Sequence, residues 1–237
     1  GLQGPVDGTY RQKFDMYQSD WSNVYIQARG GKKMNGEDFI FLGSASMDSE
    51  MRLETVFVGD ADNLEGMELE GKGVMTTASS RENFNKLSEV GAKAIFVVAA
   101  DEDQFMQTLP RQARFRMMSR LRFDKELPGE ESIIFSIPPS LAANLMRSSV
   151  EDLMEAKDSP SDIRSRNVRF KVEEQLKTVS TENMMAFLEG TDLKDEVLVI
   201  SSHYDHIGQN EDGTVINNGA DDDGSGTTGV MEIAEAF

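Results

Sequence analysis

The chain has 237 residues, of which 38% are hydrophobic, and it carries a formal net charge of −18 with no cysteine. This length and apolar content suffice for one large domain or two smaller ones, and the lack of cysteine excludes disulfides and thiolate metal sites. The negative charge argues against nucleic-acid binding as the main role, because phosphates would be repelled. No apolar run approaches the ~20 residues of a membrane helix, so we expect no membrane span.

The first 50 residues have the pattern of short strands. Apolar and polar side chains alternate from Tyr10 to Met16, and apolar runs follow at 24–26 and 39–42. The dipeptide Asn35-Gly36, a strong hairpin signal, separates these two runs. We therefore predict a β-rich region over residues 1–50.

Strand and helix patterns alternate in the next part of the chain. Apolar runs predict strands at 54–59, 71–76 and 94–98, and helical spacing between the last two ends at Gly91, a suitable C-cap. A strand, a helix and a strand within about 30 residues indicate a βαβ unit. The loop at 76–80 contains no glycine, so we expect no phosphate-binding motif there.

Positive charge gathers between residues 111 and 125 of this acidic chain, at Arg111, Arg114, Arg116, Arg120, Arg122 and Lys125. One interpretation is a patch that steers acidic peptides or carboxylates toward an active site. The interpretation that we favour is a solvated helix face, in which the arginine stems cover Phe115, Met117 and Met118.

The second half of the chain begins with a predicted helix at 140–156, after Pro138-Pro139, and a predicted linker at 157–165. Alternating patterns then predict strands at 168–179 and 180–190. Residues 197–200 (Val-Leu-Val-Ile) form a continuous apolar run that is typical of a buried strand.

The only two histidines, His203 and His206, follow that run directly. Polar groups just past the carboxyl end of a buried strand lie where open α/β sheets place their sites. Asp205 is close enough to accept the second imidazole N–H of His203, and Asp221 lies 18 residues further on (221 − 203), within reach of the same strand end. A histidine with carboxylates suits zinc, with manganese and cobalt as alternatives.

A helix is predicted after the acidic cluster 221–223, since apolar side chains share one helical face at Val230, Ile233, Ala234 and Phe237. The cluster also fits the spacing of an EF-hand calcium loop, with Glu232 at the twelfth position. An EF-hand needs a helix before its loop, however, and residues 210–220 are rich in Gly and Asn. A solvated turn without any ligand is the other alternative.

The motifs HYDHIG at 203–208, NGADDDGSG at 218–226 and EIAEAF at 232–237 together resemble the co-catalytic di-zinc aminopeptidase family. Its relatives include glutamate carboxypeptidase II, glutaminyl cyclases and the non-catalytic transferrin receptor. The resemblance implies an α/β fold with a three-layer α/β/α zinc-peptidase core. It also implies that His203 binds one zinc ion, that Asp205 supports His203 in catalysis, and that Asp221 bridges two zinc ions, with a cis peptide between residues 221 and 222.

A second resemblance concerns EGKGV at 70–74, LSEVGAKAI at 87–95 and IIFSI at 133–137. These stretches resemble the protease-associated domain, a β-rich module that is inserted in many members of this peptidase family. The two resemblances together imply three parts. These are an N-terminal β-rich part of the peptidase region (1–50), a protease-associated domain (51–157) and the N-terminal part of the zinc-peptidase core (158–237).

The function that the resemblance implies is that of a metal-dependent exopeptidase, most simply an aminopeptidase that removes N-terminal residues from peptides outside the cytoplasm. A carboxypeptidase, a glutaminyl cyclase and a non-catalytic receptor-like protein are the alternatives. The family's Glu-Glu pair, a later Asp and a second metal-binding His do not follow in this sequence, and His206 is too close to His203 to replace that His. We therefore expect this chain to be an inactive part of a larger peptidase, without its general base.

Overall fold

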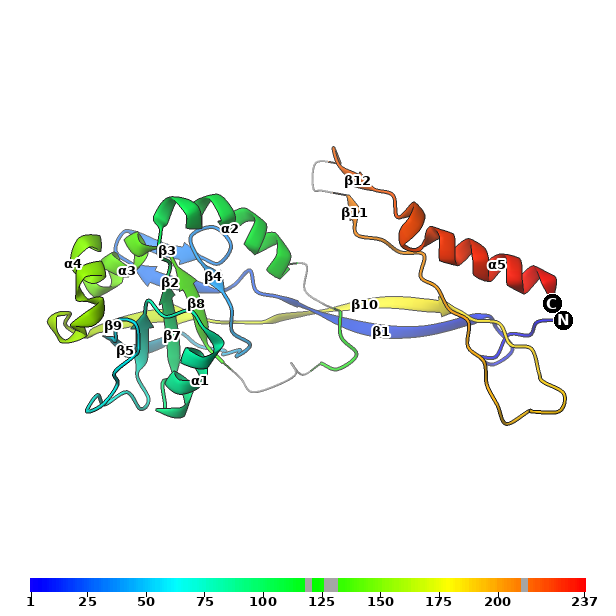
Figure 1. Cartoon of the computed structure of the whole chain (residues 1–237), viewed down its shortest axis with the longest axis horizontal. Helices are drawn as coiled ribbons and strands as arrows, with labels where there is room; N and C mark the ends of the chain where they lie inside the picture. The colour runs from blue at the N-terminus through cyan, green and yellow to red at the C-terminus, as the bar shows by residue number, and fades with distance from the viewer. Residues whose placement is uncertain (118–120, 126–131, 210–212) are drawn as a thin grey trace. The chain divides into compact units, whose positions relative to one another are not determined.

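The computed structural model describes residues 1–117, 121–125, 132–209 and 213–237. The chain forms two compact units, one of residues 15–179 and one that combines 1–14 with 180–237. Strands β1 (Arg11–Asp20) and β10 (Gln175–Met184) pair with each other and contribute residues to both units (Figure 1). The domain boundaries at residues 50 and 157 stay predictions.

A mixed sheet is the frame of the unit 15–179, with strand order β3-β2-β9-β5-β6-β7-β8-β4 among the described residues. Its strands are β2 (Tyr25–Ala28), β3 (Gly31–Met34), β4 (Ile40–Phe41), β5 (Met51–Phe57), β6 (Gly73–Thr76), β7 (Ala94–Val98), β8 (Ile134–Ile137) and β9 (Arg166–Lys171). Strands β5 to β8 run parallel, whereas the outer strands pair antiparallel. With the helices below, the sheet confirms the α/β fold class.

Helices cover the two faces of this sheet. They are α1 (Arg81–Glu89), α2 (Glu102–Met117), α3 (Pro139–Met146) and α4 (Val150–Glu155). Successive side chains of a strand point to opposite faces. In β7, Ile95 and Val97 accordingly lie in a cluster with Leu87 of α1, whereas Phe96 lies in a cluster with Leu141 of α3. Every residue of β7 is buried, as the parallel interior of a two-faced sheet requires.

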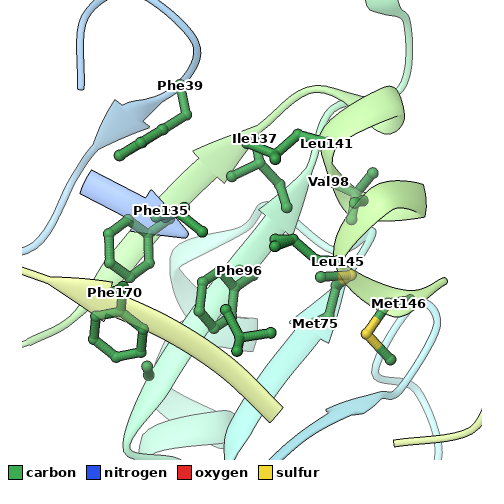
Figure 2. Close-up of a cluster of buried hydrophobic side chains, with 14 of the residues drawn as sticks. Phe39, Met75, Phe96, Val98, Phe135, Ile137, Leu141, Leu145, Met146 and Phe170 are labelled. Atoms are coloured by element: carbon green, nitrogen blue, oxygen red, sulfur yellow. The ribbon is translucent and has the colours of Figure 1, made fainter. Parts of the chain in front are cut away.

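The larger cluster is built on phenylalanines (Figure 2). Phe96 and Phe135 stack with ring centroids 5.0 Å apart, and Phe170 meets Phe135 edge-on at 5.1 Å. All three are fully buried. Such ring pairs add about 0.5–1.5 kcal/mol to the free energy of burying the side chains, so these three rings stabilise the packing of β7, β8 and β9 on one face of the sheet.

The predicted helix at 140–156 is two helices, because Arg147 takes a left-handed conformation (φ 58°) and ends α3. Ser149 then starts α4 with a capping box, in which its side chain accepts from the Asp152 N–H. Short 3₁₀ turns occupy Ala156–Asp158, at the start of the predicted linker, and Pro160–Asp162, within it. None of the helices in the described ranges combines the length and the apolar character that crossing a bilayer requires.

The arginine-rich segment is only partly a solvated helix face. Arg111 and Arg114 are exposed on α2, as predicted, but Phe115 is 73% exposed and is not covered by arginine stems. Arg122 is also different, since its side chain is 13% exposed and its guanidinium lies 2.8 Å from Glu174 Oε1. The predicted roles of Arg120 and Met118, and of the Met117 side chain, lie outside the described residues.

The unit that combines 1–14 with 180–237 is built differently. It contains the hairpin β11 (Gly208–Gln209) and β12 (Ile216–Asn217) and the helix α5 (Gly226–Ala236). The predicted helix is thus present, but on its apolar face Ile233 and Phe237 are exposed. The predicted buried strand at 197–200 is wrong, since Leu198 is 86% exposed and no described strand pairs with this segment. An apolar run becomes a buried strand only where neighbours satisfy its backbone and cover its side chains.

Candidate metal site

The candidate site is formed by the loop at residues 203–206 and by the start of α5. The main chain of His203 is held from both sides. Its N–H donates to Asp223 Oδ2 at 3.2 Å, and its carbonyl accepts from Thr227 Oγ1 at 2.9 Å. Gly226 permits this arrangement, because a Cβ there would come within 2.2 Å of Asp223 Oδ1. The beginning of α5 therefore fixes the position of His203.

The imidazole of His203 is oriented by the main chain of its own loop. Its Nδ1 lies 2.8 Å from the carbonyl oxygen of Asp205. Because a carbonyl can only accept, Nδ1 donates in this bond, and Nε2 is the nitrogen that faces the acidic cluster. That Nε2 lies 3.2 Å from Asp222 Oδ1. The bond to the Asp205 carbonyl, followed by the charges of Asp223, Asp222 and Asp205, raises the pKa of His203.

The carboxylate opposite His203 belongs to Asp222, one residue after the predicted ligand Asp221. No ion pair joins His203 to Asp221 in the part of the chain that the structure describes. Asp222 and Asp223 have non-helical dihedral angles (φ −110°, ψ 90° and φ −127°, ψ 37°) at the turn into α5. The cis peptide lies between Asp222 and Asp223, so the predicted position between residues 221 and 222 is wrong.

Asp205 meets His203 through its main chain rather than through its carboxylate. Its Oδ1 is 3.7 Å from His203 Nδ1, and the side chain is 92% exposed. The main-chain carbonyl is the closer acceptor and sets the tautomer. Metal-binding histidines usually donate their second N–H to a carboxylate or to a main-chain carbonyl, and both serve the same purpose.

The second histidine also lies at this site, which the spacing of the sequence did not predict. His206 Nε2 is 4.0 Å from Asp222 Oδ2, on the other oxygen of the carboxylate that faces His203. Its Nδ1 lies 3.0 Å from the Asn217 carbonyl oxygen. Asp222 therefore lies between two imidazoles.

His203 and Asp222 fit a zinc ion. Two donors bound to one tetrahedral zinc at about 2.0–2.1 Å are about 3.3 Å apart, close to the 3.2 Å between His203 Nε2 and Asp222 Oδ1. No group of three or more His, Asp or Glu side chains that could hold a metal ion occurs within the described ranges. The described residues thus supply two ligands of a site that usually needs three or four from the protein.

The structure does not support the calcium-loop alternative. The described element before the acidic cluster is β12, a strand of a hairpin, whereas an EF-hand places a helix there. Glu232, the expected twelfth ligand, lies in the middle of α5 and is exposed.

A histidine and a carboxylate therefore face each other at the start of α5, as two ligands of one metal ion would. Residues 183–237 match the family model described as Peptidase family M28. This segment, which contains the whole candidate site, is therefore similar to that family. No curated protein matches the chain.

Two solved structures resemble the chain at low identity. An aminopeptidase from Aneurinibacillus sp. strain AM-1 is 20% identical, with 91% of this chain and 46% of that chain covered and a TM-score of 0.40. A peptidase M28 precursor from Shewanella amazonensis SB2B is 14% identical, with 91% and 48% covered and a TM-score of 0.35. The chain thus spans about half the length of these proteins.

Proposed function

We propose that this chain is part of a zinc-dependent exopeptidase, and that the parent protein removes N-terminal residues from peptides with two zinc ions that share one carboxylate. The observation that carries the proposal is the 3.2 Å separation of His203 Nε2 from Asp222 Oδ1, with His203 Nδ1 tied to the Asp205 carbonyl. The match of this segment to Peptidase family M28 supports the peptide substrate.

Each residue of the site has a part in this proposal. His203 Nε2 and the Asp222 carboxylate would hold zinc. The Asp205 carbonyl keeps the lone pair of Nε2 directed at the metal position, while Asp223 and Thr227 keep His203 at the start of α5. When bound, zinc polarises a carbonyl group and makes water nucleophilic at neutral pH. The shared carboxylate is thus Asp222 in this proposal, in place of Asp221.

A calorimetric titration of the chain with zinc tests the site itself. We expect weak binding in the wild type, because two protein ligands are fewer than a zinc site normally uses, and no measurable binding in His203→Ala. Tyr204→Phe is the matched control, since Tyr204 lies next to His203 and is 68% exposed. Zinc binding that is unchanged in His203→Ala would contradict the proposal.

The choice of an aminopeptidase is tested on the parent protein with pairs of peptides that differ only in acetylation of the N-terminus. We expect release of the first residue from the free peptide and none from the acetylated one. Cleavage at the C-terminus, or cyclisation of an N-terminal glutamine, would favour a carboxypeptidase or a glutaminyl cyclase.

An extracytoplasmic location of the parent protein is part of the same proposal.

A further inference from the structure

His206 is anchored by the short hairpin that follows it. Its Nδ1 lies 3.0 Å from the Asn217 carbonyl oxygen, so Nδ1 donates in this bond. Asn217 is itself fixed, because it pairs with Gly208 in the β11·β12 register and its side-chain amide donates to the Gly208 carbonyl at 3.0 Å. The ring of His206 is thus held at its Nδ1 edge, and its other edge is left to face Asp222.

The backbone at Gly219 provides the seat for this ring. Gly219 has a φ of +66°, and a Cβ there would come within 2.7 Å of His206 Cβ and 2.8 Å of His206 Cγ. Any larger residue would therefore displace His206. The result is a partly enclosed imidazole: the His206 side chain is 26% exposed, against 52% for His203.

Held in this way, His206 directs Nε2 at Asp222 Oδ2, 4.0 Å away, while His203 Nε2 lies 3.2 Å from Oδ1 of the same carboxylate. A distance of 4.0 Å exceeds that of a direct hydrogen bond but is one that a single water spans. It is also longer than the separation of about 3.3 Å between two ligands of one tetrahedral zinc. The distance thus fits a contact of His206 with the carboxylate better than a pair of ligands on one zinc ion.

We infer that His206 is a positioning residue of the metal site. Anchored at Asn217 and seated on Gly219, it holds Oδ2 of Asp222 so that Oδ1 stays directed at His203. This inference rests on the proposed function for its consequence, which is metal affinity, but the arrangement itself exists in the metal-free chain. Residues that orient metal ligands typically change metal affinity by about 10–100-fold when they are replaced.

Two substitutions distinguish a role of His206 in positioning Asp222 from a role in supporting the β11·β12 hairpin. In His206→Asn the amide nitrogen takes the place of Nδ1, so the bond to the Asn217 carbonyl is kept and the group that faces Asp222 is lost. In His206→Gln the amide nitrogen takes the place of Nε2, so the group that faces Asp222 is kept and the anchor is lost. Tyr204→Phe, in the same loop, is the control.

Zinc affinity of the full chain is the first readout. We expect binding about 10-fold weaker in His206→Asn, and a smaller loss in His206→Gln. If His206 only supports the hairpin, the order is reversed, and wild-type affinity in His206→Asn overturns the inference. Loss of binding in His203→Ala, measured alongside, shows separately that the proposed metal site exists.

The second readout needs no metal. Long-range ¹H–¹⁵N spectra of the metal-free chain report which nitrogen of each imidazole carries the proton. We expect His206 to be protonated at Nδ1, and its Nε2 signal to move in Asp222→Asn but not in Asp221→Asn. A proton on Nε2 alone, or an Nε2 signal that does not respond to Asp222→Asn, overturns the inference even if zinc does not bind.

Discussion

The two units of this chain contrast in how their side chains are used. Every buried residue within the described ranges belongs to residues 15–179, and none belongs to 1–14 or 180–237. The unit 15–179 has an aromatic core between its sheet and its helices, whereas the other unit holds the chemical groups of the site in hydrogen bonds between loop and helix. The contrast teaches that contacts to its main chain can hold His203 in place where the described part of its unit contains no buried residue.

The largest effect that we predict concerns the core of the unit 15–179. Phe135→Ala removes a fully buried ring that contacts Phe96 and Phe170, and should lower the free energy of unfolding by about 3–5 kcal/mol. Leu198→Ala, the matched control in the other unit, removes an 86% exposed side chain and should change it by less than about 0.5 kcal/mol. Urea denaturation measures both, and equal losses would refute the contrast between the units.

The next effect concerns ion pairs. Arg122 and Glu174 are 13% and 14% exposed and 2.8 Å apart, and Ser19 hydrogen-bonds to both. Glu174→Gln leaves a buried guanidinium without its counter-charge, so we expect a loss of about 3 kcal/mol of unfolding free energy.

The matched control for this pair is Glu189→Gln, which breaks the pair with Lys194 (2.9 Å, with side chains 66% and 58% exposed). An exposed pair contributes little, so we expect a change below about 0.5 kcal/mol. Denaturation at low and high salt distinguishes the two, because salt screens only the exposed pair effectively. A loss in Glu174→Gln no larger than that in Glu189→Gln would show that burial does not matter here.

The smallest effect that we predict is a loss of folding stability at acid pH. The hydrogen bond from Lys177, at 2.5 Å, and the one from the Ser22 N–H lower the pKa of Asp20 to about 2. A lowered pKa stabilises the fold above the ordinary value of 3.8, and this contribution is lost as the pH falls toward 2. The full shift corresponds to about 2.4 kcal/mol, and we expect about 1 kcal/mol because Lys177 is 59% exposed.

Comparison of the wild type with Asp20→Asn isolates this contribution from those of the other carboxylates. The difference in unfolding free energy should be about 1 kcal/mol at pH 6 and should shrink as the pH approaches 2. A difference that stays constant over this range would mean that the charge of Asp20 contributes nothing to stability.

The sequence predicted the sheet of the unit 15–179 better than it predicted the unit that combines 1–14 with 180–237, for a physical reason. Residues 94–98 and 197–200 are both continuous apolar runs, yet only the first is a buried strand. Strand character is local, but burial depends on which neighbours pair with the strand and cover it. Arg122 is a similar case, because nothing near it in the sequence shows that Glu174 supplies its counter-charge.

For the candidate site, the sequence predicted a histidine near the acidic cluster, and the metal-binding roles of His203, Asp205 and Asp221 stay predictions. The spacing of residues 203–226 brought a histidine and the acidic cluster together correctly, but three consecutive aspartates have equal claims until the backbone angles at the turn are known. The role of the Asp205 main chain is likewise invisible in a pattern of side chains. Gly219 lies against His206 in the structure, but a glycine in the sequence does not show which side chain it contacts.

The central claim is that Asp222, and not Asp221, shares a metal ion with His203. It is tested most directly by titrating zinc into Asp222→Asn and Asp221→Asn, which differ from the wild type by one charge each at adjacent positions. The account predicts that Asp222→Asn loses zinc binding as completely as His203→Ala does, while Asp221→Asn binds within about threefold of the wild type. Binding that is lost in Asp221→Asn and kept in Asp222→Asn would contradict it.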